Sequence, residues 1–433
     1  MAYTDSNNRL LSPQQNPYAA FGSASAVAGQ DFRHPIAEIE EISNLIERVR
    51  YILKYQTEPI RFFFAGDYGS GKSARLNLVR REIIQNDSSI CIPIRFQEVV
   101  HDISLAKNHK LTELTNLYGM ILQHIMDSLL SQNCLHREEC QDLLKKAHKT
   151  QFIDLVIELF KATYKKNILL IFDEVEILFS SLDINISQFM TFMHSLSEQL
   201  FSINSVWGIC VSVTGEYLID IKREATQLKD GRFDFITIEH LSPVEVKEYV
   251  EKKNCHTTQR YNDKAYPFDE EVVEFISVVS GGLPRYIEVI CHLLWSSKAE
   301  EVKSGIVDIQ TARRVFTNKY KAQASAYFSY ISQQRNLSRE IEAFFNLLFL
   351  EGGYKLSVKE LISRGSYNRI SYFYQLTDSQ VNYVLSKKVS KILRDKLYNE
   401  QDFPKIIEIY RSKSYLFSLT NLAYKNIYNF ELT

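Results

Sequence analysis

The sequence has few cysteines and no long apolar run, and both absences limit what the protein can be. Its six cysteines are spread over 433 residues, without the dense spacing of a disulfide framework. The most apolar stretch, residues 168–172, ends at Asp173 and Glu174, so nothing approaches the ~18 apolar residues of a membrane-spanning helix. No apolar signal segment stands at the N-terminus. We therefore expect a cytoplasmic protein that does not associate with membranes.

An excess of positive charge is also lacking. The 51 Lys and Arg residues are balanced by 52 Asp and Glu residues, which gives a formal net charge of −1. Bulk charge therefore cannot drive binding to a polyanion, and any nucleic-acid surface must be a local patch. What the sequence does have is a large apolar and aromatic content, with 45% hydrophobic residues, 25 Tyr and 26 Phe. This composition is typical of folded domains with sizeable cores.

The first half of the chain alternates between strand-like and helix-like patterns. Residues 1–30 come first; they are polar, lack periodicity and predict a flexible arm. Apolar runs typical of strands lie at residues 60–65, 90–96, 168–172, 206–213 and 235–238. Helical spacing of apolar residues occurs at residues 36–53, 72–85, 111–130, 152–163 and 186–201. Several strands lack polar alternation, which predicts an α/β core over residues 31–241 with helices on both faces of a parallel sheet.

The rest of the chain predicts two further domains. Residues 242–332 contain no strand-like run and are expected to form a helical lid. Its first helix should begin at Ser242-Pro243, since Ser caps helix N-termini and Pro suits the first turn. Residues 333–433 have the element order of a winged helix. A capping box at Thr377 and Gln380 opens its third helix, and a hairpin with a turn at residues 411–414 follows.

Basic residues gather on two elements of this C-terminal domain. They share one face of the third helix or lie at the tip of the hairpin, an arrangement that suits contacts with DNA phosphates. The residues are Lys387, Lys391, Arg394, Arg411 and Lys413. The alternative is a solvated helix face on a winged helix that binds protein.

A phosphate-binding loop is the strongest motif in the sequence. Residues 66–73 read Gly-Asp-Tyr-Gly-Ser-Gly-Lys-Ser, which matches the pattern G-x-x-x-x-G-K-[ST] between a predicted strand and a predicted helix. The glycines allow the backbone to curl and to aim its N–H groups at phosphate oxygens, and the helix N-terminus adds more donors. We expect nucleotide contacts from Gly66, Tyr68, Gly69, Ser70, Gly71, Lys72, Ser73 and Ala74.

The side chains of this loop predict ATP and Mg²⁺ as ligands. Lys72 is expected to reach the β- and γ-phosphates, and Ser73 to ligate Mg²⁺. About 100 residues later, the apolar run at residues 168–172 delivers Asp173 and Glu174, which is the Walker B arrangement. Asp173 would hold the metal, and Glu174 would deprotonate the attacking water. The acidic pair therefore predicts hydrolysis as well as binding.

Two further positions have both a functional and an ordinary interpretation. Thr214 follows the fourth predicted strand, where it either touches the γ-phosphate or merely ends the strand. Arg285, in Gly282-Leu283-Pro284-Arg285, either reaches the phosphates from the lid or only decorates a helix start.

A possible metal site stands apart from these motifs. Cys134, His136 and Cys140 lie close together, with His148 beyond, but their spacing matches no zinc signature, so ordinary helix residues are the main interpretation.

The order of these motifs resembles that of AAA+ ATPases. It is most similar to the branch with the archaeal and eukaryotic replication initiators and related prokaryotic regulatory ATPases. The lead-in, Asn16-Pro17-Tyr18, Phe21-Gly22 and Gly29-Gln30-Asp31-Phe32, also looks like that of this family, and the resemblance covers about residues 16–330. It implies a P-loop NTPase sheet followed by a helical lid and, through a weaker extension, a C-terminal winged helix.

The resemblance also implies roles for single residues. Thr214 falls at the first sensor and Arg285 at the second. Arg232 falls where such proteins place an arginine finger that acts on a neighbouring subunit's ATP, and Arg223, with Lys222 beside it, is the rival.

Two departures from the family pattern limit these roles. Residues 32–35 read Phe-Arg-His-Pro where Gly-Arg-Glu is usual, which leaves the adenine pocket unassigned. Thr214 stands where Asn is frequent, which implies slow or partner-dependent hydrolysis.

Two functional hypotheses follow. The first is an AAA+ ATPase that uses ATP and Mg²⁺ to assemble as a homo-oligomer on DNA, as an initiator, a loader or a transposition-type regulator. The second is an ATP-switched oligomerisation subunit of a multi-protein defence or signalling system, whose winged helix binds a protein partner. A phosphotransferase is disfavoured because no acceptor-binding domain is evident. DNA affinity with and without ATP distinguishes the first two.

Overall fold

The computed structural model describes most of the chain as two compact units. The first, here the core unit, comprises residues 28–239, and the second unit comprises residues 1–27 and 240–433. Within them the structure describes residues 16–18, 40–55, 59–84, 89–105, 113–136, 138–139, 152–163, 167–182, 184–200, 207–228, 233–258, 266–301, 306–334, 338–351, 356–370, 372–374, 376–389, 407–411, 415–419 and 421–428.

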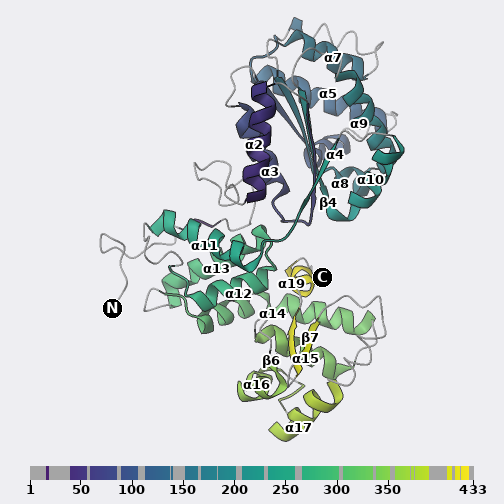
Figure 1. Cartoon of the computed structure of the whole chain (residues 1–433). Helices are drawn as coiled ribbons and strands as arrows, with labels where there is room; N and C mark the ends of the chain where they lie inside the picture. Colours follow the sequence, from purple (N-terminus) through teal and green to yellow (C-terminus); the bar gives the residue numbers. More distant parts are fainter. Residues whose placement is uncertain are drawn as a thin grey trace. The chain divides into compact units, whose positions relative to one another are not determined.

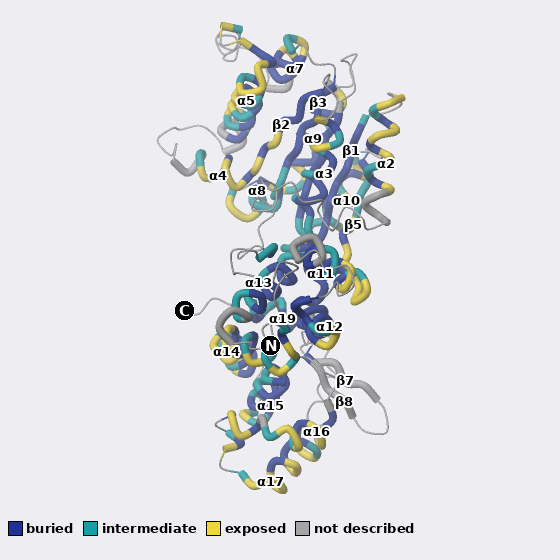
Figure 2. The backbone as a smooth tube through the Cα atoms, turned by 90° about the vertical axis from the view of Figure 1, so that its left-hand side faces the viewer, coloured by how far each residue is buried: buried dark blue, intermediate teal, exposed yellow. Residues whose placement is uncertain are grey.

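The core unit is built on a five-stranded parallel sheet (Figure 1). Its strands are β1 (Ile60–Gly66), β2 (Ser89–Arg95), β3 (Asn167–Asp173), β4 (Trp207–Thr214) and β5 (Asp234–Ile238), in the spatial order β2-β3-β4-β1-β5. Every residue of β1 is buried, and β3 is buried up to its last residue, Asp173 (Figure 2). The predicted parallel sheet is confirmed.

Helices cover both faces of this sheet, as the apolar strands predicted. On one face lie α2 (Glu40–Tyr55) and α3 (Lys72–Ile84), whose apolar residues pack with Phe62 and Phe64. On the other face, around Phe63, lie α4 (Phe96–Leu105), α5 (Glu113–Ser131), α7 (Phe152–Ala162), α8 (Glu176–Ser181), α9 (Ile186–Leu200) and α10 (Leu218–Gln227). The alternation of Phe62, Phe63 and Phe64 between the two layers follows from the two-residue period of a strand.

Strand register decides which loops meet at the carboxyl edge of the sheet. Gly66, the first residue of the phosphate-binding loop, pairs in register with Thr214 at the end of β4. Strand β4 lies between β1 and β3, so the ends of these three strands form one edge. Loops that follow neighbouring parallel strands converge there, which brings the two nucleotide motifs of the sequence together.

The second unit begins with a helical bundle. Its helices are α11 (Pro243–Thr258), α12 (Glu270–Ser280), α13 (Pro284–Glu301) and α14 (Ile309–Gln334). Helix α12 is capped at its start by Asp269, whose carboxylate accepts from the Val272 N–H at 2.8 Å, and at its end by Gly281 with φ 59°. Gly282 follows with φ 73°, and its carbonyl accepts from the Leu241 N–H at 2.9 Å. The Gly-Gly pair therefore joins Leu241, which lies just before α11, to the start of α13.

The C-terminal part of this unit has the predicted helix, helix, helix and hairpin order. It contains α15 (Arg339–Leu350), β6 (Leu356–Ser357), α16 (Val358–Ser363), the short helix η4 (Ser366–Arg369), α17 (Asp378–Tyr383), the π-helical segment η5 (Val384–Val389), β7 (Ile407–Arg411), β8 (Tyr415–Leu419) and α19 (Asn421–Tyr428). The capping box of Thr377 and Gln380 is present. In the described ranges, no helix is both long and apolar enough to cross a membrane.

Two details of this part differ from the prediction. The third helix is α-helical only to Tyr383 and continues as the wider π-helix, so a 3.6-residue spacing does not hold along it. Arg411 was placed in the hairpin turn, but it ends β7, because its backbone pairs with Tyr415 across the hairpin.

Candidate functional site

The phosphate-binding loop has the backbone that its glycines predict. Gly69 and Gly71 have φ angles of 85° and 96°, in the left-handed region that side chains with a Cβ avoid. The Ser70 N–H donates to the Asp67 carbonyl at 3.1 Å and closes the turn. Arg75, buried in α3, donates from Nη1 to the Ser70 carbonyl at 3.2 Å. The sequence analysis missed Arg75, which fastens the loop to the helix that follows it.

Lys72 lies folded back over this loop. It is the first residue of α3 and is 7% exposed. Its ammonium donates to the carbonyl of Gly66 at 3.0 Å and to that of Asp67 at 3.2 Å. Burial lowers the pKa of Lys72, and nearby carboxylates, Glu176 foremost, oppose the shift. The structure thus places a buried cation over carbonyl groups in a loop shaped to receive an anion.

Ser212 organises the acidic end of β3. This buried serine of β4 donates its hydroxyl hydrogen to Asp173 Oδ1, and Ser212 Oγ in turn accepts from the Glu174 N–H at 3.0 Å. The Ser212 carbonyl accepts from the Val175 N–H at 3.2 Å. Sequence reasoning missed this residue. The available signal was a serine inside an apolar strand, two residues before Thr214 and so on the same face of the sheet.

Glu174 has an unusual backbone conformation. Its φ is 61°, in the left-handed region where residues other than glycine are uncommon. Both amides that follow Asp173, those of Glu174 and Val175, are held by Ser212. Strained conformations of this kind persist when the surroundings determine them, and they gather at functional sites.

Glu176 is a second acidic residue that sequence reasoning missed. It opens α8, and burial raises the pKa of its carboxyl against the lowering effect of the Lys72 ammonium. Asp67, Asp173 and Glu174 also act electrostatically on Lys72. The buried lysine is thus surrounded by carboxylates from the loop, from the end of β3 and from the start of α8.

The oxygen groups near Lys72 suit Mg²⁺ better than a softer metal. Ser73 and Asp173 offer hydroxyl and carboxylate oxygens, the ligands that Mg²⁺ takes together with substrate phosphates. In the described part of the chain, no three His, Cys, Asp or Glu side chains converge as a metal site of their own. The residues present therefore fit a metal that arrives with a phosphate ligand.

The alternative metal site finds no support in its described residues. Cys134 is buried, and its thiol donates to the Gln132 carbonyl. His136 is exposed, while Cys140 and His148 lie outside the described residues.

The two sensor candidates lie in different units. Thr214 is half-buried beside Gly66, and its hydroxyl donates to Glu216 Oε1 at 3.3 Å. Arg285 lies in the first turn of α13 in the second unit and is half-buried. Within the core unit, the structure brings together the loop, the Asp173–Glu174 pair and Thr214.

The arginine-finger candidates are described only in part. Arg232 lies outside the described residues. Arg223 is exposed on α10 and forms an ion pair with Asp220 at 2.7 Å, one turn away on the same helix. The Lys222 ammonium lies 5.5 Å from the centre of the Phe235 ring.

The expected DNA contacts are also described only in part. Lys387 is exposed on η5, and Arg411 lies in β7. Lys391, Arg394 and Lys413 lie outside the described residues. Next to Lys387, Lys388 forms an ion pair with Glu340 at 3.7 Å.

Comparisons with known proteins find likeness in structure only. No protein-family model matches the chain, and no curated protein does. One similar solved structure is the Aeropyrum pernix ORC1 protein in complex with DNA, with 12% identity, a TM-score of 0.41 and coverage of 91% of this chain and 96% of that chain. Another is the Aeropyrum pernix ORC2 protein in its ADPNP–ADP complexes, with 12% identity, a TM-score of 0.46 and coverage of 93% and 96%.

A third is Cdc6p from Pyrobaculum aerophilum, with 12% identity, a TM-score of 0.45 and coverage of 94% of this chain and 98% of that chain. Because the identities and the TM-scores are low, we infer the function from the site itself.

Proposed function

We propose that this chain is an ATPase of the AAA+ class, which binds ATP with Mg²⁺ at residues 66–74 and hydrolyses it. The observation that supports this most strongly is the placement of Lys72. Its ammonium is buried over the loop carbonyls and is surrounded by the carboxylates at the end of β3. A buried cation in a loop with left-handed glycines suits the phosphates of a nucleotide.

Binding exchanges the partners of Lys72. The β- and γ-phosphates replace the carbonyls of Gly66 and Asp67, so charged acceptors take the place of neutral ones. Backbone N–H groups of the loop and of the first turn of α3 would donate to the same oxygens, as they do where helix N-termini bind phosphate. Ser73 and Asp173 would hold Mg²⁺, which when bound neutralises charge on the phosphates.

Hydrolysis uses the residues around Asp173. Glu174 accepts the proton of the attacking water, and Ser212 holds the backbone that presents Glu174. Thr214, beside Gly66, contacts the γ-phosphate or the water. Arg285 is a further proposed ligand of the phosphates, and Arg232 or Arg223 acts on the ATP of a neighbouring subunit.

We further propose that nucleotide binding controls assembly on DNA through the C-terminal helices and hairpin. Exposed Tyr383 and Lys387 lie four residues apart on adjoining helical segments, which combines an aromatic ring with a positive charge. The second candidate, a protein-binding winged helix in an ATP-switched complex, is favoured by the Lys388–Glu340 ion pair, which removes one positive charge from this surface.

One pair of measurements tests these proposals. Phosphate release from ATP, followed with Mg²⁺ and with excess EDTA, should show turnover that depends on Mg²⁺. DNA affinity, measured with and without ATP over a range of salt, should rise with ATP and fall steeply with salt, because each neutralised phosphate releases counterions. ATP turnover without any DNA binding would favour the protein-partner switch, and absence of adenine-nucleotide binding would contradict the proposed ATPase.

A further inference from the structure

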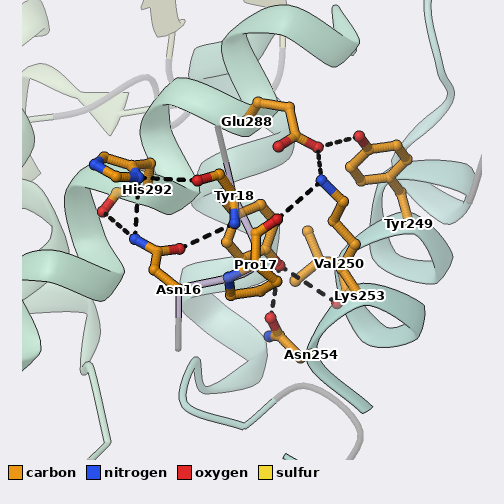
Figure 3. A network of polar contacts seen from close by, with 9 residues as sticks. All are labelled: Asn16, Pro17, Tyr18, Tyr249, Val250, Lys253, Asn254, Glu288 and His292. Atoms are coloured by element: carbon orange, nitrogen blue, oxygen red, sulfur yellow. Dashed lines mark hydrogen bonds and ion pairs between the residues drawn. The ribbon is translucent and has the colours of Figure 1, made fainter. Parts of the chain in front are cut away.

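Three residues near the N-terminus are built into the helices of the second unit (Figure 3). Asn16, Pro17 and Tyr18, here the N-terminal anchor, belong to the segment expected to be a flexible arm. Tyr18 is only 4% exposed. Its ring centre lies 6.3 Å from that of Phe268 and 6.1 Å from that of Trp295. The expectation is therefore wrong for Tyr18, which packs as a core residue does.

Asn16 and Tyr18 make contacts that depend on their side chains. Asn16 Nδ2 donates to the His292 carbonyl at 3.2 Å and to Ser296 Oγ at 3.3 Å, while Asn16 Oδ1 accepts from the Tyr18 N–H at 3.0 Å. The Tyr18 hydroxyl donates to Asn254 Oδ1 at 2.6 Å. An aspartate in place of Asn16 would lack the donor, and a phenylalanine in place of Tyr18 would lack the hydroxyl. The helices therefore distinguish this short sequence from close variants of it.

The helices also hold the backbone of the anchor. The Lys253 ammonium donates to the Pro17 carbonyl at 3.4 Å and lies 5.1 Å from the centre of the Tyr18 ring. His292 Nδ1 lies 3.0 Å from the Tyr18 carbonyl oxygen. Contacts with a peptide backbone supply affinity, and contacts with its side chains supply specificity. The anchor thus makes both kinds of contact that a bound peptide makes with its receptor.

The residues that contact the anchor, here the docking site, are Lys253, Asn254, Phe268, His292, Trp295 and Ser296. This site is held together by contacts that do not include the anchor. Lys253 on α11 and Glu288 on α13 form a buried ion pair, and the Tyr249 hydroxyl donates to the same Glu288 oxygen. The rings of Phe268 and Trp295 meet edge to face, with their centres 6.4 Å apart. The docking site is therefore preorganised, which lowers the cost of binding a peptide there.

The length of the chain does not confine the anchor to the docking site of its own copy. Residues 19–39 lead from the anchor to α2, the first described helix of the core unit. Fully extended, they span up to ~70 Å, which is more than the ~40 Å diameter of a compact domain of about 200 residues. A second copy of this chain carries the same anchor and the same docking site. Every contact of the anchor can therefore also form between two copies.

We propose that the docking site is a peptide-binding site for Asn-Pro-Tyr that accepts the N-terminal segment of a second copy, so that two copies exchange their anchors. The inference goes beyond the proposed ATPase, because no residue of the nucleotide site takes part in it. Exchange preserves all contacts of the anchor, and its cost is the entropy of association. The anchor of the same copy competes with that of the partner, so exchange increases with protein concentration.

A synthetic peptide of residues 13–21 tests the recognition. It is titrated into full-length Tyr18→Ala, and tryptophan fluorescence is the signal, because Trp295 is one of two tryptophans and lies beside the Tyr18 ring. We expect saturable binding of one peptide per chain, and apparent binding at least about tenfold weaker in the wild type, whose own anchor competes. The same peptide with Asn16→Asp should bind Tyr18→Ala at least about tenfold more weakly. Tyr330→Ala, which removes an exposed tyrosine of α14, is the matched control and should behave as the wild type does.

Mixing two full-length variants tests the exchange between copies. Tyr18→Ala keeps the docking site and lacks the ring of the anchor, whereas His292→Ala keeps the anchor and lacks the ring nitrogen that contacts the Tyr18 carbonyl. In sedimentation velocity without nucleotide, the mixture should associate more than either variant alone, and excess peptide should dissociate the complex. Asn16 is half-exposed, so Asn16→Ala replaces Tyr18→Ala in both experiments where the latter fails to fold.

Two results would overturn the inference. If the peptide does not bind saturably, or if its Asn16→Asp form binds equally well, the docking site does not recognise Asn-Pro-Tyr. If the peptide binds selectively but the mixture associates no more than either variant alone, the anchor stays in its own copy and no exchange occurs. Lys72→Ala should give the same peptide affinity and the same association as the wild type, so a failure of the proposed ATP site is distinguished from a failure of this inference.

Discussion

Glu174 combines an uncommon backbone angle with the position of a catalytic base. Its φ of 61° costs a residue with a Cβ roughly 1–2 kcal/mol. Ser212 provides the compensating contacts, since its oxygens accept from the amides of Glu174 and Val175. The local strain is thus held in place by one residue of the neighbouring strand.

Glu174→Gln should keep nucleotide binding and slow hydrolysis about 10²- to 10⁴-fold, the usual contribution of a general base. The substitution preserves size and leaves Asp173 to hold the metal. Single-turnover phosphate release and equilibrium binding, measured on the same preparation, check it. Turnover within about threefold of the wild type, ~0.6 kcal/mol of barrier, would remove Glu174 from the role of base.

Ser212→Ala should lower turnover about tenfold or more, because it removes a hydrogen bond to a carboxylate and releases the Glu174 amide. The matched control is Ser197→Ala. Ser197 of α9 is also fully buried, but its hydroxyl has no hydrogen-bond partner among the described residues. The ratio of kcat in the two variants measures the effect of losing the hydrogen bonds of the Ser212 hydroxyl, separately from the effect of removing a buried hydroxyl. Equal kcat values would show that Ser212 only fills space.

Residues of this kind escape sequence reading for a physical reason. The loop and the Asp173–Glu174 pair can be recognised from the sequence, because the residues of each motif are adjacent in the chain. Ser212 and Glu176 become functional only through the register of β4 beside β3 and through the start of α8. These residues lie close to one another in space but far apart in the sequence, so no local sequence pattern predicts that they meet.

At the scale of elements, strands were predicted best where both faces are buried. The strand predicted at residues 168–172 is β3, Asn167–Asp173, because a continuous apolar run has few other stable placements. The third C-terminal helix was predicted less well. Its capping box fixed the start, but the change to a π-helix at Val384 leaves no mark in a 3.6-residue pattern.

Gly282 sets the junction between the first and third helices of the second unit, and Gly282→Ala should destabilise that unit by at least about 2 kcal/mol. A Cβ here would lie 2.1 Å from the Leu241 carbonyl oxygen, and φ is 73°. The control is Gly119→Ala on α5, where an added Cβ meets nothing within 4 Å and should stabilise by up to ~1 kcal/mol. Calorimetric unfolding compares the two. An unchanged transition in Gly282→Ala would refute this packing.

At the scale of the whole molecule, the proposed arginine finger requires two subunits for one site. Arg232→Ala should keep ATP binding and lower hydrolysis in the assembled state, by ~10³-fold if it acts like the best fingers. Arg223→Ala is tested separately, because Arg223 already pairs with Asp220 on its own helix.

Mixing Arg232→Ala with Lys72→Ala protein tests the shared site directly. Each variant lacks a different half, so some mixed interfaces join an intact loop to an intact finger, and ATP turnover should partly recover. Size-exclusion chromatography first establishes that the two variants assemble together. If activity does not recover in such a mixture, Arg232 acts on the ATP of its own subunit or only stabilises its loop.

The central claim is that Lys72 holds the phosphates of ATP, and isothermal titration of ATP with Mg²⁺ into Lys72→Ala tests it most directly. Lys161→Ala, which removes an exposed lysine of α7, serves as the control for loss of one positive charge. Charge-assisted contacts of a buried ammonium are worth ~1.5–3 kcal/mol or more. We predict that Lys72→Ala weakens binding at least about tenfold while Lys161→Ala matches the wild type; equal affinity in all three proteins would contradict the account.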